Sequence, residues 1–263
     1  MTRVAVKNVW KEYDGSVVLE RINLDVAPHS FVSIVGPSGC GKSTFLRMLL
    51  SQEAPSRGSI TIDGKSLPPE PTDDRGVVFQ RYSVFPHLTA LDNVAFGLEV
   101  AKAPLSGRLF GSRRRAVLSE CREVLAAVGL GGACDKYPHQ MSGGMQQRLA
   151  IAQALIKKPK VLLLDEPFGA LDPGIRVDIH QLMLKLFEET GMTAFMVTHD
   201  LREAFHLGTR LIAFDRYRTR PEEIGAYGAT ITFDLPLDRS SSRERKKAME
   251  KLQDKVAEAS AQI

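Results

Sequence analysis

The chain is poor in cysteine and has no hydrophobic stretch long enough to cross a membrane. Its three cysteines, Cys40, Cys121 and Cys134, are far apart and form no C-x-x-C pair, which favours reduced thiols in a reducing compartment over disulfides. The first residues, M-T-R-V-A-V-K-N, lack the apolar core of a signal peptide, and no apolar run approaches about 18 residues. We therefore expect a protein that is neither exported by that route nor embedded in a membrane, and that works at a membrane only through a partner.

A strong charge of one sign is also absent. The net charge is +4, and the dense basic clusters at 113–115 and 243–247 are too short to favour nucleic acid over a solvated surface. No internal repeat or low-complexity segment is visible in the sequence. A chain of 263 residues with 43% hydrophobic residues suits one large α/β domain, here 1–238, followed by a polar tail at 239–263.

Strands and helices alternate in the first and last thirds of the chain, and helices alone are expected between them. The hydrophobic patterns predict strands at 4–10, 22–26, 31–35, 58–62, 76–79, 161–164, 193–197, 210–214 and 229–235, and helices at 43–51, 91–99, 113–128, 143–157, 174–189 and 200–207. We expect a largely parallel α/β core, about 1–80 and 158–238, interrupted by a helical insert at about 81–157. The tail is expected to be a terminal helix, either docked or frayed.

A phosphate-binding loop is the most specific motif. Residues 36–43 read G-P-S-G-C-G-K-S, which fits G-x-x-x-x-G-K-[ST] between a strand and a helix. Backbone N–H groups of such a loop and the positive helix N-terminus surround a β-phosphate. Lys42 would reach the β- and γ-phosphate oxygens, Ser43 would ligate Mg²⁺, and Cys40 is interpreted as a small filler rather than a nucleophile. The predicted nucleotide-binding residues here are Gly36, Pro37, Ser38, Gly39, Cys40, Gly41, Lys42, Ser43 and Thr44.

Two acids follow a second buried strand. Residues 161–167 read V-L-L-L-D-E-P, which places both carboxylates at the C-terminal end of the strand, where α/β proteins bind ligands. Asp165 would hold Mg²⁺, and Glu166 would polarise the attacking water as a general base. Solvated acids at a strand end are common, but in a chain that also has a phosphate loop we favour the catalytic interpretation.

Further motifs complete an ordered set. Gln80 ends G-V-V-F-Q, residues 141–148 read M-S-G-G-M-Q-Q-R, Asp172 ends A-L-D, and His199 stands in V-T-H-D after an apolar strand. With the phosphate loop and the acids, they give residues 4–215 a resemblance to the ATP-binding cassette (ABC) ATPases. The resemblance implies a P-loop NTPase (RecA-like) core with an N-terminal antiparallel β part and an inserted helical subdomain, which binds ATP and Mg²⁺ and hydrolyses ATP.

The family resemblance also implies roles for single residues. Gln80 matches the Q-loop glutamine, which contacts Mg²⁺ and the attacking water, and His199 matches the switch histidine. Tyr13 fits the aromatic residue that stacks on adenine, and Asp172 matches the D-loop acid at the dimer interface. Taken alone, each has another interpretation: Gln80 as a polar strand cap, His199 as a helix-start residue, Tyr13 as packing, and Asp172 as the cap of the next helix.

The signature segment supplies only half of an anion site. Ser142 can cap a helix, and Gly143 and Gly144 let a ligand approach its N–H groups, but M-S-G-G-M contains neither a lysine nor an acid. In the family, the signature of one cassette closes over the γ-phosphate held by another, head to tail. The resemblance therefore implies a second ABC subunit, with contacts to its nucleotide from Ser142, Gly143, Gly144, Met145 and Asp172.

An apolar segment follows Gln80, and in transporter cassettes it helps to bind the permease. Its candidate coupling residues are Tyr82, Val84, Phe85, Pro86 and Leu88. F-P-H-L-T followed by D-N-V-A-F-G-L is similar to bacterial importer ATPases. Met145 resembles the nitrate/sulfonate/taurine importers, whereas F-P-H-L-T is closer to polyamine- and iron-type cassettes. The stretches 104–112 and 216–228 fit no family pattern that we can place.

Several functions compete at this stage. We favour an importer subunit at the cytoplasmic face of the cell membrane, attached to permease subunits, to a second copy of itself and, through the system, to an extracytoplasmic solute-binding protein. An exporter or lipoprotein-extraction ATPase is the alternative, because the permease is not encoded here. A soluble DNA-repair or translation cassette predicts a long coiled coil, zinc-binding cysteines or two cassettes in one chain, and a binding-only cassette predicts loss of Glu166 or His199; the sequence has none of these features.

Overall fold

The computed structural model describes residues 2–80, 83–103, 109–218, 223 and 225–237, and the chain divides into two compact units. Unit 1 contains residues 1–2, 50–52 and 68–194, and unit 2 contains 3–49, 53–67 and 195–263. No helix among the described residues is both long enough and apolar enough to cross a bilayer.

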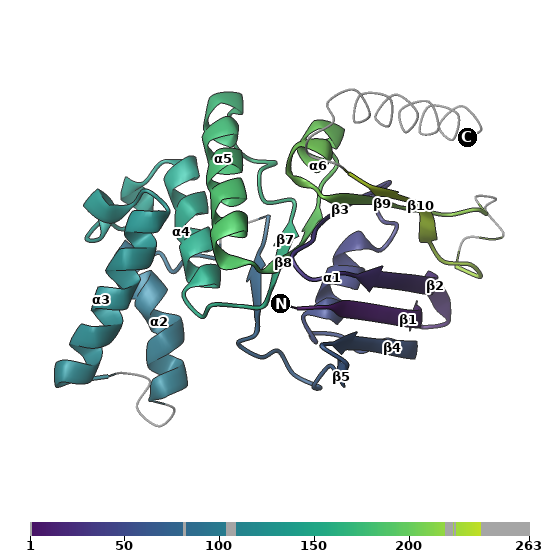
Figure 1. Ribbon diagram of the computed structural model, residues 1–263, viewed down its shortest axis with the longest axis horizontal. Helices are drawn as coiled ribbons and strands as arrows, with labels where there is room; N and C mark the ends of the chain where they lie inside the picture. The colour runs from purple at the N-terminus through teal and green to yellow at the C-terminus, as the bar shows by residue number, and fades with distance from the viewer. Residues whose placement is uncertain (1, 81–82, 104–108, 219–222, 224, 238–263) are drawn as a thin grey trace. The chain divides into compact units, whose positions relative to one another are not determined.

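Unit 2 contains an antiparallel sheet with the strand order β2-β1-β4-β5 (Figure 1). Its strands are β1 (Val4–Tyr13), β2 (Ser16–Val26), β4 (Arg57–Ile62) and β5 (Lys65–Ser66). Alternating side chains of β1, among them Val4 and Val6, are buried, as one covered sheet face requires. Asp14 and Gly15 have φ of 47° and 82°, the conformation of a two-residue hairpin turn. This turn fixes the register in which Tyr13 pairs with Ser16.

Unit 2 also contains the parallel pair that precedes the phosphate loop. Strand β3 (Phe31–Val35) runs parallel to β9 (Arg210–Asp215), which pairs antiparallel with β10 (Thr230–Pro236). Helix α1 (Lys42–Leu49) follows β3. The short helix α6 (Leu201–Leu207) packs against β3. The ring of Phe45 in α1 lies 5.3 Å from that of Phe214 and 6.5 Å from that of Phe195, edge to face. These buried aromatic contacts anchor α1 on the sheet.

Unit 1 combines a parallel strand pair with helices. Strand β6 (Arg75–Val78) runs parallel to β7 (Val161–Asp165). The helices are α2 (Ala90–Lys102), α3 (Gly111–Ala127), α4 (Gly143–Leu155) and α5 (Pro173–Thr190), with 3-10 turns at Gly131–Ala133 and Pro138–Gln140. Helices α2, α3 and α4 pack on one another (Figure 1). On α3, Val117, Cys121 and Leu125 form a buried stripe at four-residue spacing.

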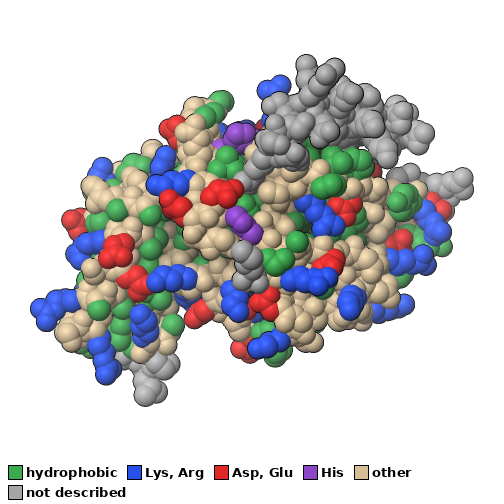
Figure 2. All heavy atoms as spheres, viewed as in Figure 1, with side chains coloured by type: hydrophobic (Ala, Val, Ile, Leu, Met, Phe, Trp, Pro, Cys, Tyr) green, Lys and Arg blue, Asp and Glu red, His purple; other side chains and the backbone are tan. Residues whose placement is uncertain are grey.

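Strand β8 (Thr193–Val197) belongs to both units, because Thr193 and Ala194 lie in unit 1 and its last three residues lie in unit 2. All five of its residues are buried. This matches the continuous apolar run expected of an interior strand in an α/β protein. On the face seen in Figure 2, basic and acidic side chains are interspersed, which agrees with the weak net charge.

The predicted α/β character, with a separate antiparallel sheet and a helical part, is confirmed. The bounds differ where local signals were overlooked. The predicted strand at 22–26 is the second half of β2, and β1 continues to Tyr13, because the Asp14-Gly15 turn lets both strands run on. The predicted helix at 43–51 ends at Leu49. The predicted tail helix at 239–263 lies outside the described residues, as do 104–108 of the 104–112 stretch and 219–222 and 224 of the 216–228 stretch.

Candidate functional site

The phosphate loop of unit 2 depends on glycine at defined positions. Gly36, Gly39 and Gly41 have φ of 150°, 77° and 93°, a region that side chains with a Cβ avoid. A Cβ on Gly36 would also lie 2.1 Å from the carbonyl oxygen of Phe214. The backbone of the loop therefore reaches its conformation only with this glycine spacing, as binding of phosphate by N–H groups requires.

Lys42 begins α1 and bends back over the loop. Its Nζ donates to the carbonyl oxygens of Gly36 and Pro37, each at 2.7 Å, and the side chain is buried. The ammonium group thus stands at the loop that it would serve, held by two backbone acceptors. Cys40 is also buried, and burial raises the pKa of its thiol. This supports the interpretation of Cys40 as a filler, because a nucleophilic cysteine needs a lowered pKa.

The second group of residues lies in unit 1, at the ends of two parallel strands. Val78 of β6 is opposite Leu164 of β7, so Gln80 and Glu166 each follow two residues beyond this pair. The Gln80 amide nitrogen donates to Glu166 Oε2 at 3.1 Å. Glu166 has φ of 46°, and such left-handed non-glycine residues cluster at functional sites because they are strained by about 1–3 kcal/mol. The structure thus joins a predicted base to the residue predicted to contact the same water.

A magnesium ion fits the predicted donors by chemistry. Gln80 and Asp165, both in unit 1, offer an amide and a carboxylate oxygen, and Ser43, in unit 2, offers a hydroxyl oxygen; Mg²⁺ prefers oxygen ligands of these kinds. The hydrogen bond to Glu166 uses the Gln80 amide nitrogen, so the amide oxygen is the atom that would bind a metal ion. Among the described residues no group of three His, Cys, Asp or Glu side chains forms a metal cage.

His199 is exposed at the end of β8, in unit 2, between two fixed neighbours. The Thr198 backbone N–H donates to the Ile34 carbonyl oxygen at 3.1 Å, and its hydroxyl donates to Glu203 at 2.7 Å in a buried contact. Asp200 caps α6 by accepting from the backbone N–H groups of Arg202 and Glu203. Because both flanking residues are anchored, the imidazole of His199 is presented from a rigid backbone.

The signature segment begins α4 as expected. Ser142 is the N-cap, and its hydroxyl accepts from the Met145 N–H at 3.3 Å. Ser142 and Gly143 are exposed, whereas Gly144 is buried against α5. A Cβ on Gly144 would lie 2.4 Å from Ile175 Cγ2, so the two helices approach more closely than an alanine would allow. Ser142 and Gly143 are therefore accessible to a ligand, while Gly144 packs closely against α5.

The structure argues against a helix cap as the role of Asp172 and against core packing as the role of Tyr13. Asp172 stands at the N-cap position of α5, but its side chain makes no capping hydrogen bond and is exposed. Tyr13, at the end of β1 in unit 2, is 39% exposed, so its ring is accessible to a base rather than packed in the core. Both observations support the roles that the family resemblance implies.

The candidate coupling segment is held by a buried asparagine. Asn93 of α2 accepts from the Phe85 N–H at 2.8 Å and donates to the carbonyl oxygens of Phe85, Leu88 and Thr89. Phe85 and Pro86 are exposed, and Val84 and Leu88 are half-buried. Tyr82 lies outside the described residues.

Sequence reasoning missed two residues of this surface. The ring of Phe96 lies 4.8 Å from that of Phe85, and Phe96 and Val100 of α2 are 43% and 42% exposed. Their four-residue spacing was the available signal, because it places both side chains on the same helix face. Phe85, Phe96 and Val100 are hereafter called the apolar patch.

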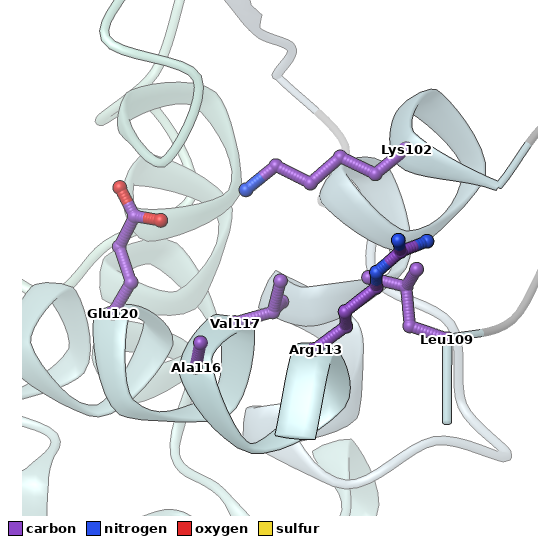
Figure 3. A pocket seen from close by; sticks show the side chains of 6 residues that line it. All are labelled: Lys102, Leu109, Arg113, Ala116, Val117 and Glu120. Carbon is purple, nitrogen blue, oxygen red and sulfur yellow. The ribbon is translucent and has the colours of Figure 1, made fainter. Parts of the chain in front are cut away.

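A separate hollow of about 380 Å³ lies beside α2 and α3 (Figure 3). It is lined by Lys102, Leu109, Arg113, Ala116, Val117 and Glu120. Glu120 forms an ion pair with Lys158 at 3.0 Å. None of the predicted site residues lines this hollow, so it is distinct from the nucleotide motifs.

Comparison with known proteins agrees with this arrangement. The family model described as ABC transporter matches residues 19–169. An uncharacterized ABC transporter ATP-binding protein of Methanocaldococcus jannaschii is 39% identical, covering 97% of this chain and 92% of that protein. The sulfate/thiosulfate import ATP-binding protein CysA of Pseudomonas aeruginosa is 40% identical over 86% of this chain and 67% of its own length. The spermidine/putrescine import ATP-binding protein PotA of Spiroplasma citri is 43% identical over 80% of this chain, which spans only 58% of PotA.

Solved structures extend the likeness to the fold. The ATP-binding cassette MJ0796, solved as a dimer, is 34% identical and covers 89% of this chain, with a TM-score of 0.71. Its dimeric post-hydrolysis state, bound to ADP and Pi, matches over the same 89% of this chain with a TM-score of 0.69. The predicted P-loop NTPase fold is therefore confirmed, and the chain belongs to the ABC transporter family as an ATP-binding cassette, an enzyme that hydrolyses ATP.

Proposed function

We propose that the chain is the ATP-hydrolysing subunit of a membrane importer for a small polar solute, and that it works as a pair of cassettes at the cytoplasmic face of the cell membrane. The observation that carries this proposal is the paired Gln80 and Glu166 beside an exposed segment suited to a permease. The names of two relatives, a sulfate/thiosulfate and a spermidine/putrescine import ATP-binding protein, support import as the direction of transport.

The proposed site is shared between two copies of the chain. Lys42 and the loop N–H groups bind the phosphates of ATP, with Tyr13 stacked on adenine. Ser142 and the N-terminus of α4 from a second copy then close over the γ-phosphate, with Asp172 at the same interface. The N-cap geometry of Ser142 supports this step, because a helix N-terminus attracts an anion without any basic side chain. The dimeric structures of MJ0796 give a precedent for paired cassettes.

Hydrolysis in this proposal uses Glu166, Gln80 and His199. Water attacks the γ-phosphorus, the bond from phosphorus to the ADP oxygen breaks, and Glu166 accepts the proton of the water. The Gln80 side chain fixes the Glu166 carboxylate and orients the same water, while His199 donates a hydrogen bond to the γ-phosphate. Mg²⁺ bound by Ser43, Gln80 and Asp165 with the phosphates would neutralise phosphate charge.

Opening and closing of the pair is the proposed source of transport work. ATP favours the closed pair, and loss of phosphate removes the contact to Ser142, so the two cassettes separate. The segment from Gln80 to Leu88 would convey this movement to the permease. Val84, Phe85, Pro86 and Leu88 are its contact residues, and Phe96 and Val100 extend them.

The proposed solute class rests on Met145 and on the names of the relatives. Met145 in S-G-G-M favours the nitrate/sulfonate/taurine type, whereas the relatives above are named for sulfate/thiosulfate and spermidine/putrescine import. All of these solutes are small and charged or strongly polar. An extracytoplasmic solute-binding protein would select the solute, and an exporter or lipoprotein-extraction ATPase is the alternative function.

Recovery of the permease from native membranes tests the proposal. We expect the tagged wild-type chain to bring down an integral membrane protein together with an importer's solute-binding protein. Phe96→Asp should lower recovery of the membrane protein at least about tenfold, because a buried unpaired charge disrupts an apolar contact, while ATPase activity of the isolated chain is unchanged. Val177→Asp, which places the same charge at an exposed valine of α5, is the matched control.

The outcomes separate the alternatives. Recovery of a membrane protein with an exporter's architecture would replace the import proposal by the alternative. Equal recovery with Phe96→Asp and wild type would show that the apolar patch is not the coupling surface.

A further inference from the structure

Tyr13 is attached to other parts of unit 2 by its hydroxyl group. The oxygen donates its hydrogen to the Glu53 carboxylate. Glu53 comes from the loop after α1, the helix that follows the phosphate loop. A tyrosine that is 39% exposed at the end of a hairpin would otherwise rotate freely about its side-chain bonds. This bond therefore fixes the direction of the ring.

Glu53 is the common partner of this cluster. Its carboxylate pairs with Lys11 Nζ at 3.2 Å and with Arg47 at 3.5 Å, in addition to the bond from Tyr13. The Glu53 and Lys11 side chains are only 21% and 13% exposed, so the contact between them is screened less than an ordinary surface ion pair. One carboxylate thus joins β1, α1 and the aromatic ring.

Lys11 adds a constraint on the ring itself. Its Nζ lies 4.7 Å from the centroid of the Tyr13 ring, within the range of a cation–π contact. The ammonium group therefore occupies one face of the ring. An adenine base would stack on the opposite face.

The pKa shifts of the Tyr13 hydroxyl and the Glu53 carboxyl agree with this geometry. Partial burial and the bond to Glu53 raise the pKa of the Tyr13 hydroxyl. Although partial burial opposes it, the bonds from Tyr13 and Lys11 hold the pKa of the Glu53 carboxyl below its usual value. At neutral pH the hydroxyl therefore keeps its proton and the carboxylate stays charged, as the hydrogen bond requires.

We propose that Glu53 is a positioning residue for the nucleotide base: it fixes the Tyr13 ring, one face of which Lys11 covers, so that the other face receives adenine. This inference rests on the proposed role of Tyr13 in the ATP site. It assigns a function to a residue that belongs to none of the sequence motifs. Glu53 contacts the ring and its neighbours, not the nucleotide, so its effect should be confined to the base.

The test compares ATP with inorganic triphosphate, which has the phosphates but no base. For Glu53→Ala we expect the KM for ATP to rise about tenfold, the size of a weakened base–aromatic stack, with kcat changed less than about twofold. The Kd for inorganic triphosphate should not change. Tyr13→Phe should match Glu53→Ala, and the double variant should add no further loss, because both remove the same bond.

Glu12→Ala is the matched control, since Glu12 is a neighbouring acid of β1 that pairs with Arg57 at 3.1 Å. It should leave the KM for ATP unchanged. If Glu53→Ala weakened triphosphate binding as much as ATP binding, the inference would be overturned, because the substitution would have damaged the phosphate loop generally. Fully additive effects of Tyr13→Phe and Glu53→Ala would also overturn it. Failure of the wild-type chain to bind ATP would instead refute the proposed nucleotide site, so the two failures are distinguishable.

Discussion

At the scale of single residues, the candidate site depends on contacts between side chains that lie far apart in the sequence. The motifs identified Gln80 and Glu166 separately, and the parallel register of their strands explains why they meet. The sequence could indicate this pairing because parallel strands end at the same edge of a sheet. Glu53 could not be found in the same way, because its partners Lys11 and Tyr13 lie some 40 residues earlier and no motif links them.

The cysteines give a prediction at this scale. Burial raises the pKa of the Cys121 thiol to about 12, and burial also raises that of Cys40. Both thiols should therefore stay largely protonated and slow to react at pH 8 in the folded protein. Half-buried Cys134, whose thiol donates to the Gly131 carbonyl oxygen at 3.3 Å, should be the first to react with iodoacetamide.

Peptide mass spectrometry after timed labelling at pH 8 measures the three rates. The same labelling in concentrated denaturant, where all three thiols should react, is the control. Modification of Cys121 as fast as Cys134 in the folded protein would contradict the burial on which this prediction rests.

At the scale of elements, most helices and strands were predictable because their hydrophobic periods are regular. The ends were less so, since they depend on local signals: the Asp14-Gly15 turn extends both β1 and β2, and the Thr89 side chain caps α2 by accepting from the Asp92 N–H. The exposed face of α2 was also missed. Its Phe96 and Val100 show the spacing of a helix stripe, but their exposure depends on how α2 packs, which the sequence alone does not reveal.

The contact between α4 and α5 gives a prediction at this scale. Gly144→Ala would place a Cβ 2.4 Å from Ile175 Cγ2, so either the Ile175 side chain or the start of α4 must move. Such overpacking should lower the free energy of unfolding by about 1–3 kcal/mol and displace Ser142. ATPase activity should fall with it, because the N-terminus of α4 would no longer be correctly placed.

Urea unfolding and steady-state ATPase assays measure both effects. Gly174→Ala is the control, since a Cβ there would meet no atom within 4 Å. The double variant Gly144→Ala with Ile175→Ala should regain part of the lost activity. A Gly144→Ala protein as stable and active as wild type would contradict the close approach of the two helices.

At the scale of the whole molecule, the central question is what completes the anion site that we propose at the start of α4, which has no charged side chain of its own. Ser142 and Gly143 at the start of α4 are exposed, yet the lysine of the phosphate loop belongs to another motif. Family membership and the dimeric MJ0796 structures support a pair in which each copy completes the other's site. The composition of M-S-G-G-M, which has neither a lysine nor an acid, is what led us to expect this arrangement from the sequence.

The most direct measurement of this claim is the mass and ATP content of the Glu166→Gln chain under saturating ATP and Mg²⁺. Glutamine keeps the shape of the side chain but cannot accept the proton, so the closed pair should persist. We predict a species of twice the chain mass that holds two ATP molecules, with no turnover. Adding Ser142→Arg should return the protein to monomers that each still bind one ATP. A Glu166→Gln chain that hydrolyses ATP rapidly, or a dimer that forms equally well with Ser142→Arg, would contradict the account.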